Sequence, residues 1–116
     1  SVMSEQATVD KIKKLASKRK SAGIIKLMGS KHADEEVLCA GLNALADIAD
    51  EDSTNELTHF LDHENPKIRT TACEAALRIG TDYIKTRVRY QLTLEQDPVV
   101  KKAVQEAFNK ARNLNL

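Results

Sequence analysis

The segment HENPKIRTTACEAALRIG, which runs from His63 to Gly80, contains the pattern that decides the fold. Its apolar residues recur at the spacing i, i+4, i+7, i+8 and i+11, which places them on one side of an α-helix. Asn65 is suited to cap the first turn, and Pro66 fits the first helical position, where its missing N–H is not needed. The segment therefore predicts one amphipathic helix with these buried residues: Ile68, Ala72, Ala75, Ala76 and Ile79.

The same pattern occurs twice more, once on each side of this segment. DEEVLCAGLNALADIA starts at Asp34 and DPVVKKAVQEAFNKAR starts at Asp97, so the period is 31 and then 32 residues. The matching apolar residues are Val37, Gly41, Ala44, Leu45 and Ile48 in the first copy, and Val100, Val104, Ala107, Phe108 and Ala111 in the last. A fixed period of this length is typical of a solenoid, in which each unit buries its apolar face only by stacking on its neighbours.

A shorter helix is expected ahead of each of these three helices, at Ala22–Ser30, Ser53–Leu61 and Asp82–Leu94. In the second one, Ser53 and Glu56 form the pattern of a capping box, which predicts a start at Ser53. In the third, the stretch RVRYQLTL (residues 87–94) alternates as a β-strand does, but a single strand among helices has no pairing partner. We expect a helix there, because its apolar residues also lie four apart: Ile84, Val88 and Leu92.

Length and composition agree with an all-α domain. The 116 residues include two phenylalanines, two tyrosines and no tryptophan, which favours closely apposed helices over an aromatic-rich β-sandwich. We expect an α-solenoid of about three helical hairpins that forms one domain over residues 1–116. Its predicted parts are an N-terminal cap helix at 3–20 and repeats at 21–50, 51–80 and 81–113.

The repeated unit of a helix, a short turn and an Asn-Pro or Asp-Pro helix resembles the HEAT-like repeat, particularly the short repeats also found in phycobilin lyase-type proteins. The resemblance covers roughly residues 22–112 and rests on the middle unit: Asn65, Pro66, Ile68, Arg69, Ala72, Ala75, Ile79 and Gly80. The first unit departs from it, with Glu35 in place of the proline and Leu38 in place of the arginine.

This resemblance implies an α-solenoid whose second helices form a concave, protein-binding side. The fold has many functions, so the resemblance identifies a scaffold rather than an activity. We expect a noncatalytic scaffold for another protein, and the alternative is a bilin-lyase-like or other enzyme accessory subunit.

The histidines are the first candidates for chemistry. His59 and His63 lie four residues apart near Asp62 and Glu64, and His32 could join them around a metal ion. Deoxyhypusine hydroxylases are HEAT-like enzymes that hold iron with several His-Glu dyads, whereas this chain has the single dyad His63-Glu64. We interpret these residues as an exposed polar helix end and expect no metal and no cofactor.

The cysteines are the next candidates. Cys39 and Cys73 have neither C-x-x-C spacing nor a neighbouring histidine, and no phosphate-binding or nucleophile motif occurs, so we expect no enzymatic activity. Two small thiols outside a disulfide framework indicate a reducing compartment. No apolar run of membrane-spanning length and no signal-peptide pattern is present, and we expect a cytoplasmic protein without a membrane partner.

The net charge of +1 hides a strongly uneven distribution. Residues 1–31 carry eight basic and two acidic residues (+6), residues 32–64 carry ten acidic residues (−10), and residues 65–116 carry ten basic and five acidic residues (+5). The basic N-terminal helix could contact nucleic acid, but without interleaved aromatic residues and with an acidic segment next to it this is a minor alternative. The basic side chains are Lys11, Lys13, Lys14, Lys18, Arg19 and Lys20, with Lys26 and Lys31.

The candidate binding residues are second-helix positions outside the apolar stripe, which stacking would align into rows on the concave side. They are Asn43, Asp47, Lys67, Thr71, Glu74, Arg78, Glu106 and Lys110, with Glu36 beside them. One such row, Asp47, Arg78 and Lys110, changes from acidic to basic and could orient a partner protein. Arg69 and Lys101 belong to the repeat pattern, and we expect each to pair with the acid or amide that opens a neighbouring unit. The sequence indicates neither the identity of the partner nor the oligomeric state.

Overall fold

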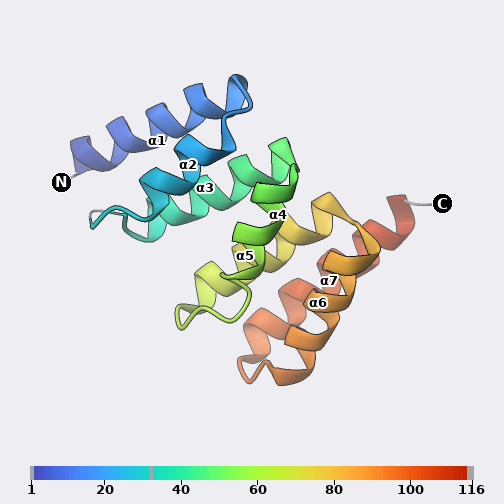
Figure 1. Cartoon of the computed structure of the whole chain (residues 1–116). Coiled ribbons are helices and arrows are strands. Elements are labelled where there is room, and N and C mark those ends of the chain that lie inside the picture. The colour runs from blue at the N-terminus through green and yellow to red at the C-terminus, as the bar shows by residue number, and fades with distance from the viewer. Residues whose placement is uncertain (1, 32, 115–116) are drawn as a thin grey trace.

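The computed structural model describes residues 2–31 and 33–114, and within these ranges every regular element is an α-helix. The helices are α1 (Val2–Ser17), α2 (Ser21–Met28), α3 (Glu35–Ile48), α4 (Glu51–Thr58), α5 (Pro66–Ile79), α6 (Asp82–Leu94) and α7 (Pro98–Leu114). They form a succession of hairpins, α2–α3, α4–α5 and α6–α7, which runs from left to right in Figure 1 with α1 ahead of the first. The chain is an all-α solenoid, as the repeat predicts.

The helices lie in two layers (Figure 1). The second helices of the hairpins pack side by side, α3 against α5 and α5 against α7, and α1 packs against the free flank of α3. The first helices form the other layer, in which α2 contacts α4 and α4 contacts α6. The N-terminal helix thus occupies the place of a second helix in the stack and covers one end of it.

The second helices begin where the repeat predicts. Asp34 accepts a hydrogen bond from the Val37 N–H, and Asn65 accepts from the N–H groups of residues 67 and 68. Asp97 accepts from the N–H groups of residues 99 and 100 at the start of α7. Each side chain satisfies backbone donors that the first helical turn would otherwise leave unpaired.

One predicted helix start is wrong. Helix α4 begins at Glu51, two residues earlier than the capping box suggests, and its cap is Asp50, which accepts from the Ser53 N–H at 2.8 Å. The Ser53 side chain instead points into the core and is fully buried. Asp50 also accepts from the Ser21 hydroxyl at 2.7 Å, so the cap joins the first helices of two successive repeats.

The stretch RVRYQLTL is helical, as expected, and lies in α6. Ile84 and Val88 are fully buried and Leu92 packs against the core, whereas Tyr90 and Leu94, which share the alternation of Val88 and Leu92, face solvent. Helical packing therefore overrides the apparent strand periodicity.

Helix α5 lies at the centre of the stack. Ala72, Ala75 and Ala76 have no exposed surface, because α3 covers one flank of α5 and α7 the other. Their small side chains permit this close approach of neighbouring helices. In α7, by contrast, Phe108 is only partly buried, because no further helix of the described chain covers the outer flank, and Ala107 is partly exposed on the side that faces α5.

Candidate functional site

A groove of about 840 Å³ opens between the C-terminal halves of α5 and α7. Its apolar floor is formed by small or aliphatic side chains: Leu77, Ile79, Ala103, Ala107 and Ala111. Its rim is polar and carries both signs of charge: Asn43, Thr71, Glu74, Arg78, Glu106 and Lys110. An apolar floor with a few charged groups of both signs has the composition of a binding site for a polypeptide segment.

Six of the eight predicted binding residues line this groove, namely Asn43, Thr71, Glu74, Arg78, Glu106 and Lys110. Asp47 lies just outside and is linked to it through Arg78 at 3.8 Å. Lys67 lies in the first turn of α5, away from the groove, where its ammonium group is 3.7 Å from Glu35. Glu36 is exposed in the first turn of α3 and does not line the groove.

Arg78 crosses from α5 to α3 at one edge of the groove. Its guanidinium donates to the Asn43 side-chain oxygen at 3.2 Å and to the Asn43 carbonyl at 3.3 Å. The Arg78 side chain is 48% exposed, so these contacts orient the charge without removing it from solvent. A ligand in the groove can therefore meet a cation whose position is already restricted.

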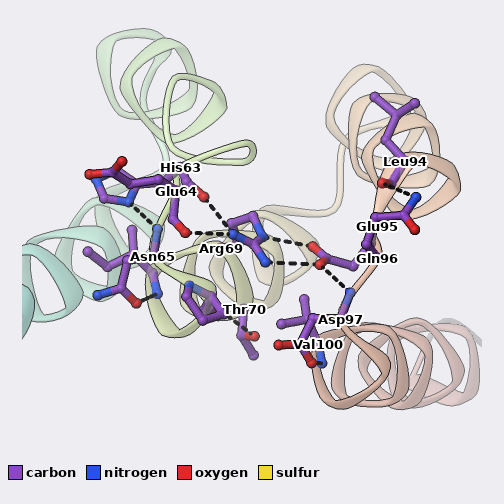
Figure 2. A network of polar contacts seen from close by, with 12 residues as sticks. His63, Glu64, Asn65, Arg69, Thr70, Leu94, Glu95, Gln96, Asp97 and Val100 are labelled. Carbon is purple, nitrogen blue, oxygen red and sulfur yellow. Dashed lines mark hydrogen bonds and ion pairs between the residues drawn. The ribbon is translucent and has the colours of Figure 1, made fainter.

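A second polar cluster ties α5 to the turn between α6 and α7 (Figure 2). The Arg69 guanidinium makes two parallel hydrogen bonds to the Glu95 carboxylate, at 2.8 and 3.0 Å. It also donates to the carbonyls of His63 and Glu64, both at 2.9 Å. The Arg69 side chain is 17% exposed and the Glu95 side chain 5%, so this paired cluster lies mostly inside the protein.

The position of the partner corrects the expectation for Arg69. The residue that opens the neighbouring helix is Asp97, and its side chain already caps α7. Arg69 therefore pairs with Glu95, which lies two residues earlier. Lys101, the equivalent residue of α7, is exposed and forms no ion pair with any residue in the described ranges. Only the middle repeat of the described chain uses this position for a junction.

Pairing and burial shift the pKa values of this cluster. The hydrogen bonds from Arg69 lower the pKa of Glu95, and the same bonds raise the pKa of Arg69. Burial raises the pKa of the Cys73 thiol to about 12. Cys73 is therefore protonated at neutral pH, a state that is unsuited to nucleophilic attack.

His63 shapes the turn before α5. Its Nδ1 accepts the backbone N–H of Asn65 at 3.0 Å, as the Glu95 carboxylate accepts the N–H of Asp97 at 3.0 Å one repeat later. His59 points to Glu56 at 3.3 Å. Across residues 2–31 and 33–114, no three metal-ligating side chains come together, and the candidate ligand His32 lies outside the described residues.

The basic residues of α1 and the following turn are exposed, including Lys11, Lys14 and Lys18. Arg19 has an additional contact, because its guanidinium donates to the Ile48 carbonyl at the end of α3 at 2.7 Å. This contact gives a hydrogen-bond donor to a carbonyl at the C-terminus of α3, which has no partner within the helix, and holds α1 beside α3. One of the candidate phosphate contacts therefore has a structural role.

Two stacked layers of helical hairpins with a groove on the second helices define the class of α-solenoid repeat proteins. The family described as HEAT repeats matches residues 21–109, and the chain belongs to this family. The match is to HEAT repeats in general and does not single out the phycobilin lyase type. The comparisons with curated proteins and with solved structures gave no match. No helix in the described part of the chain is long and apolar enough to cross a membrane.

Sequence reasoning missed Glu95 and Asp50, which both make side-chain hydrogen bonds to a neighbouring repeat. Glu95 aligns with His63 at a period of 32 residues, and both accept the N–H of the helix-capping residue. An acceptor two residues before the caps of α5 and α7 is therefore a signal that the sequence contains. Asp50 aligns with Thr81, the cap of α6, at a period of 31.

Proposed function

We propose that this chain is a noncatalytic interaction module that holds a segment of another protein in the groove between α5 and α7. The observation that carries the proposal is the composition of the groove, which combines an apolar floor with Glu74, Arg78, Glu106 and Lys110 on its rim. Repeat proteins commonly bind partners along the surface that their stacked helices share.

The charged residues on the rim indicate which charges the bound segment would carry. Arg78 and Lys110 favour carboxylates on the bound segment, whereas Glu74 and Glu106 favour basic groups. Small apolar side chains of the segment would cover Ala103 and Ala107 on the floor. The partner that fits is thus an amphipathic segment with mixed charges, which would lie along the groove as in helix-in-groove recognition.

The exposed lysines of α1 give less support to a nucleic-acid function, because the adjacent segment is strongly acidic. The two thiols, Cys39 and Cys73, are both free, which fits a reducing compartment such as the cytoplasm.

Selection from a random peptide library, followed by fluorescence anisotropy of the selected peptide, tests the proposal. Reversing both cations of the rim, with Arg78→Glu and Lys110→Glu, should weaken binding by at least about tenfold, since two favourable charge contacts become repulsive. The matched control is Lys67→Glu with Lys101→Glu, which makes the same reversal on the same two helices at their other ends. Its affinity should stay within about threefold of the wild type.

Two results would count against the groove. One is a selection that yields no peptide, and the other is a peptide that the control variant weakens as much as the groove variant does. Both variants should unfold at nearly the wild-type urea concentration, because all four side chains are exposed.

A further inference from the structure

The outer flank of the last hairpin is the end of the stack (Figure 1), and we call it the open flank of α6 and α7. No further helix of residues 2–31 and 33–114 packs on it, whereas α6 and α7 cover the same flank of α4 and α5 one repeat earlier. The caps Asp50 and Thr81 relate α4 to α6 by 31 residues, and Asn65 and Asp97 relate α5 to α7 by 32. Each residue of the open flank therefore has a counterpart on a covered flank of this chain.

The open flank is basic where the covered flank is neutral. Three cations surround a hollow of about 500 Å³ that no acidic side chain lines: Lys85, Arg89 and Arg112. Their counterparts are neutral and half-buried: Thr54, Thr58 and Gly80. Arg89 and Arg112 are exposed, and none of the three cations forms an ion pair with another residue that the structure describes.

The hollow also has an apolar lining. Leu92 of α6 and Phe108 of α7 line it and are only partly buried, whereas their counterparts, Leu61 and Ala76, are buried. The Arg89 guanidinium lies 5.4 Å from the centre of the Phe108 ring. Arginine and aromatic side chains are enriched where proteins associate, so the open flank has the composition of an interface.

The junction inside the stack indicates the charge of an occupant. Arg69 of α5 donates two hydrogen bonds to Glu95, a residue of the hairpin that covers it. Lys101 is the counterpart of Arg69 in α7, and it is exposed and without an ion pair among the described residues. An occupant stacked in the same way would place a carboxylate opposite Lys101.

We propose that the open flank of α6 and α7 binds an acidic amphipathic helix of another protein, stacked as a further hairpin would be. Apolar residues of this helix cover Leu92 and Phe108. Its carboxylates meet Lys101 at one end, and Arg89 and Arg112 at the other. Lys101 and Arg112 lie about 16 Å apart along α7 at 1.5 Å per residue, so a partner helix of about 12 residues spans both.

The charges of the two ends make end-to-end stacking of two copies unfavourable. Two open flanks would oppose cation to cation, and so would an open flank against α1, which exposes Lys11, Lys14 and Lys18. The groove between α5 and α7 lies on the other side of α7 and shares only buried or small side chains with the hollow, namely Leu77 and Ala111. The acidic helix is thus a second ligand at a second site.

Selection from a library of amphipathic helices of about 18 residues tests the open flank. The positions beside the apolar stripe vary among glutamate, glutamine and lysine, and the wild-type chain should select glutamate there. In fluorescence anisotropy, Arg89→Glu with Lys101→Glu should weaken a selected acidic helix by at least about tenfold. The matched control, Lys11→Glu with Lys14→Glu, makes the same change of net charge on α1 and should stay within about threefold of the wild type.

The groove variant, Arg78→Glu with Lys110→Glu, should likewise bind the acidic helix within about threefold of the wild type, which separates this site from the proposed peptide groove. A scrambled peptide of the same composition should bind at least about tenfold more weakly, because it has no apolar stripe. Circular dichroism should show that every variant keeps its helix content. A selection without acidic helices overturns the proposal, as does equal binding of the scrambled peptide. So does an acidic helix that the α1 or the groove variant weakens as much as the open-flank variant does.

Discussion

Helices α5 and α7 begin in the same way and bury their apolar residues to different extents. Each starts with an Asx-Pro pair and carries an alanine at the same repeat position, Ala75 in α5 and Ala107 in α7. Ala75 is fully buried between α3 and α7, whereas Ala107 is partly exposed on the floor of the groove. The same repeat position thus lies in the core in α5 and in a groove in α7.

The junction between these two helices should give the largest effect. Glu95→Ala leaves the mostly buried Arg69 guanidinium without its carboxylate, and we expect a loss of roughly 2–4 kcal/mol in the free energy of unfolding at neutral pH. His63→Ala removes the equivalent acceptor one repeat earlier, where a neutral hydrogen bond and the stacking of the ring on Phe60 are lost, and should cost about 1 kcal/mol. Urea unfolding of both variants measures the difference.

The Glu95 effect should also depend on pH. Because pairing with Arg69 lowers the pKa of Glu95, its contribution is fully present above its ordinary value of about 4.5 and is lost as the pH falls through the lower pKa of the folded state. The stability difference between the wild type and Glu95→Ala should therefore shrink as the pH is lowered below about 4.5. A difference that stays constant into the acid range would show that the carboxylate is unpaired in solution.

Packing on the two alanines gives the next effect in size. Ala75→Leu inserts three carbons into a filled contact between helices and should destabilise the protein by about 1–3 kcal/mol. Ala107→Leu directs the same atoms into the groove and should change stability by less than about 0.5 kcal/mol, while it blocks the binding of a selected peptide. Thermal unfolding and anisotropy distinguish the two, and equal costs at both positions would contradict the partial exposure of Ala107 in the groove.

The sequence predicts the stack well and its junctions less well, for physical reasons. Asp34, Asn65 and Asp97 could be identified as caps because capping depends on residues within one turn. The partner of Arg69 could not, since Glu95 is 26 residues away and reaches it only after the hairpins stack. At α4, two local capping signals compete, and Asp50 acts as the cap because Ser53 faces the core. The groove depends on how α5 and α7 stack, which no single repeat specifies.

The smallest predicted effect concerns how the second helices end. The residue that follows α3 is Ala49 with φ 56°, and the equivalent residue after α5 is Gly80 with φ 70°, whereas α7 continues past this position. The left-handed conformation costs an alanine about 1–2 kcal/mol, and the greater freedom of an unfolded glycine offsets about 0.4–1 kcal/mol of that difference. Ala49→Gly should therefore stabilise the protein by about 0.5–1 kcal/mol, and Gly80→Ala should destabilise it by a similar amount.

The two substitutions form their own control. A Cβ atom at Gly80 would meet the Leu77 carbonyl at 3.4 Å, an ordinary contact, so the cost there is conformational rather than steric. Because the two positions lie in different repeats and share no partner, their effects should add, and the double variant should unfold at nearly the wild-type urea concentration. If Ala49→Gly were instead destabilising, residue 49 would not adopt the left-handed conformation at the end of α3. The turns that follow α3 and α5 would then have different backbone conformations.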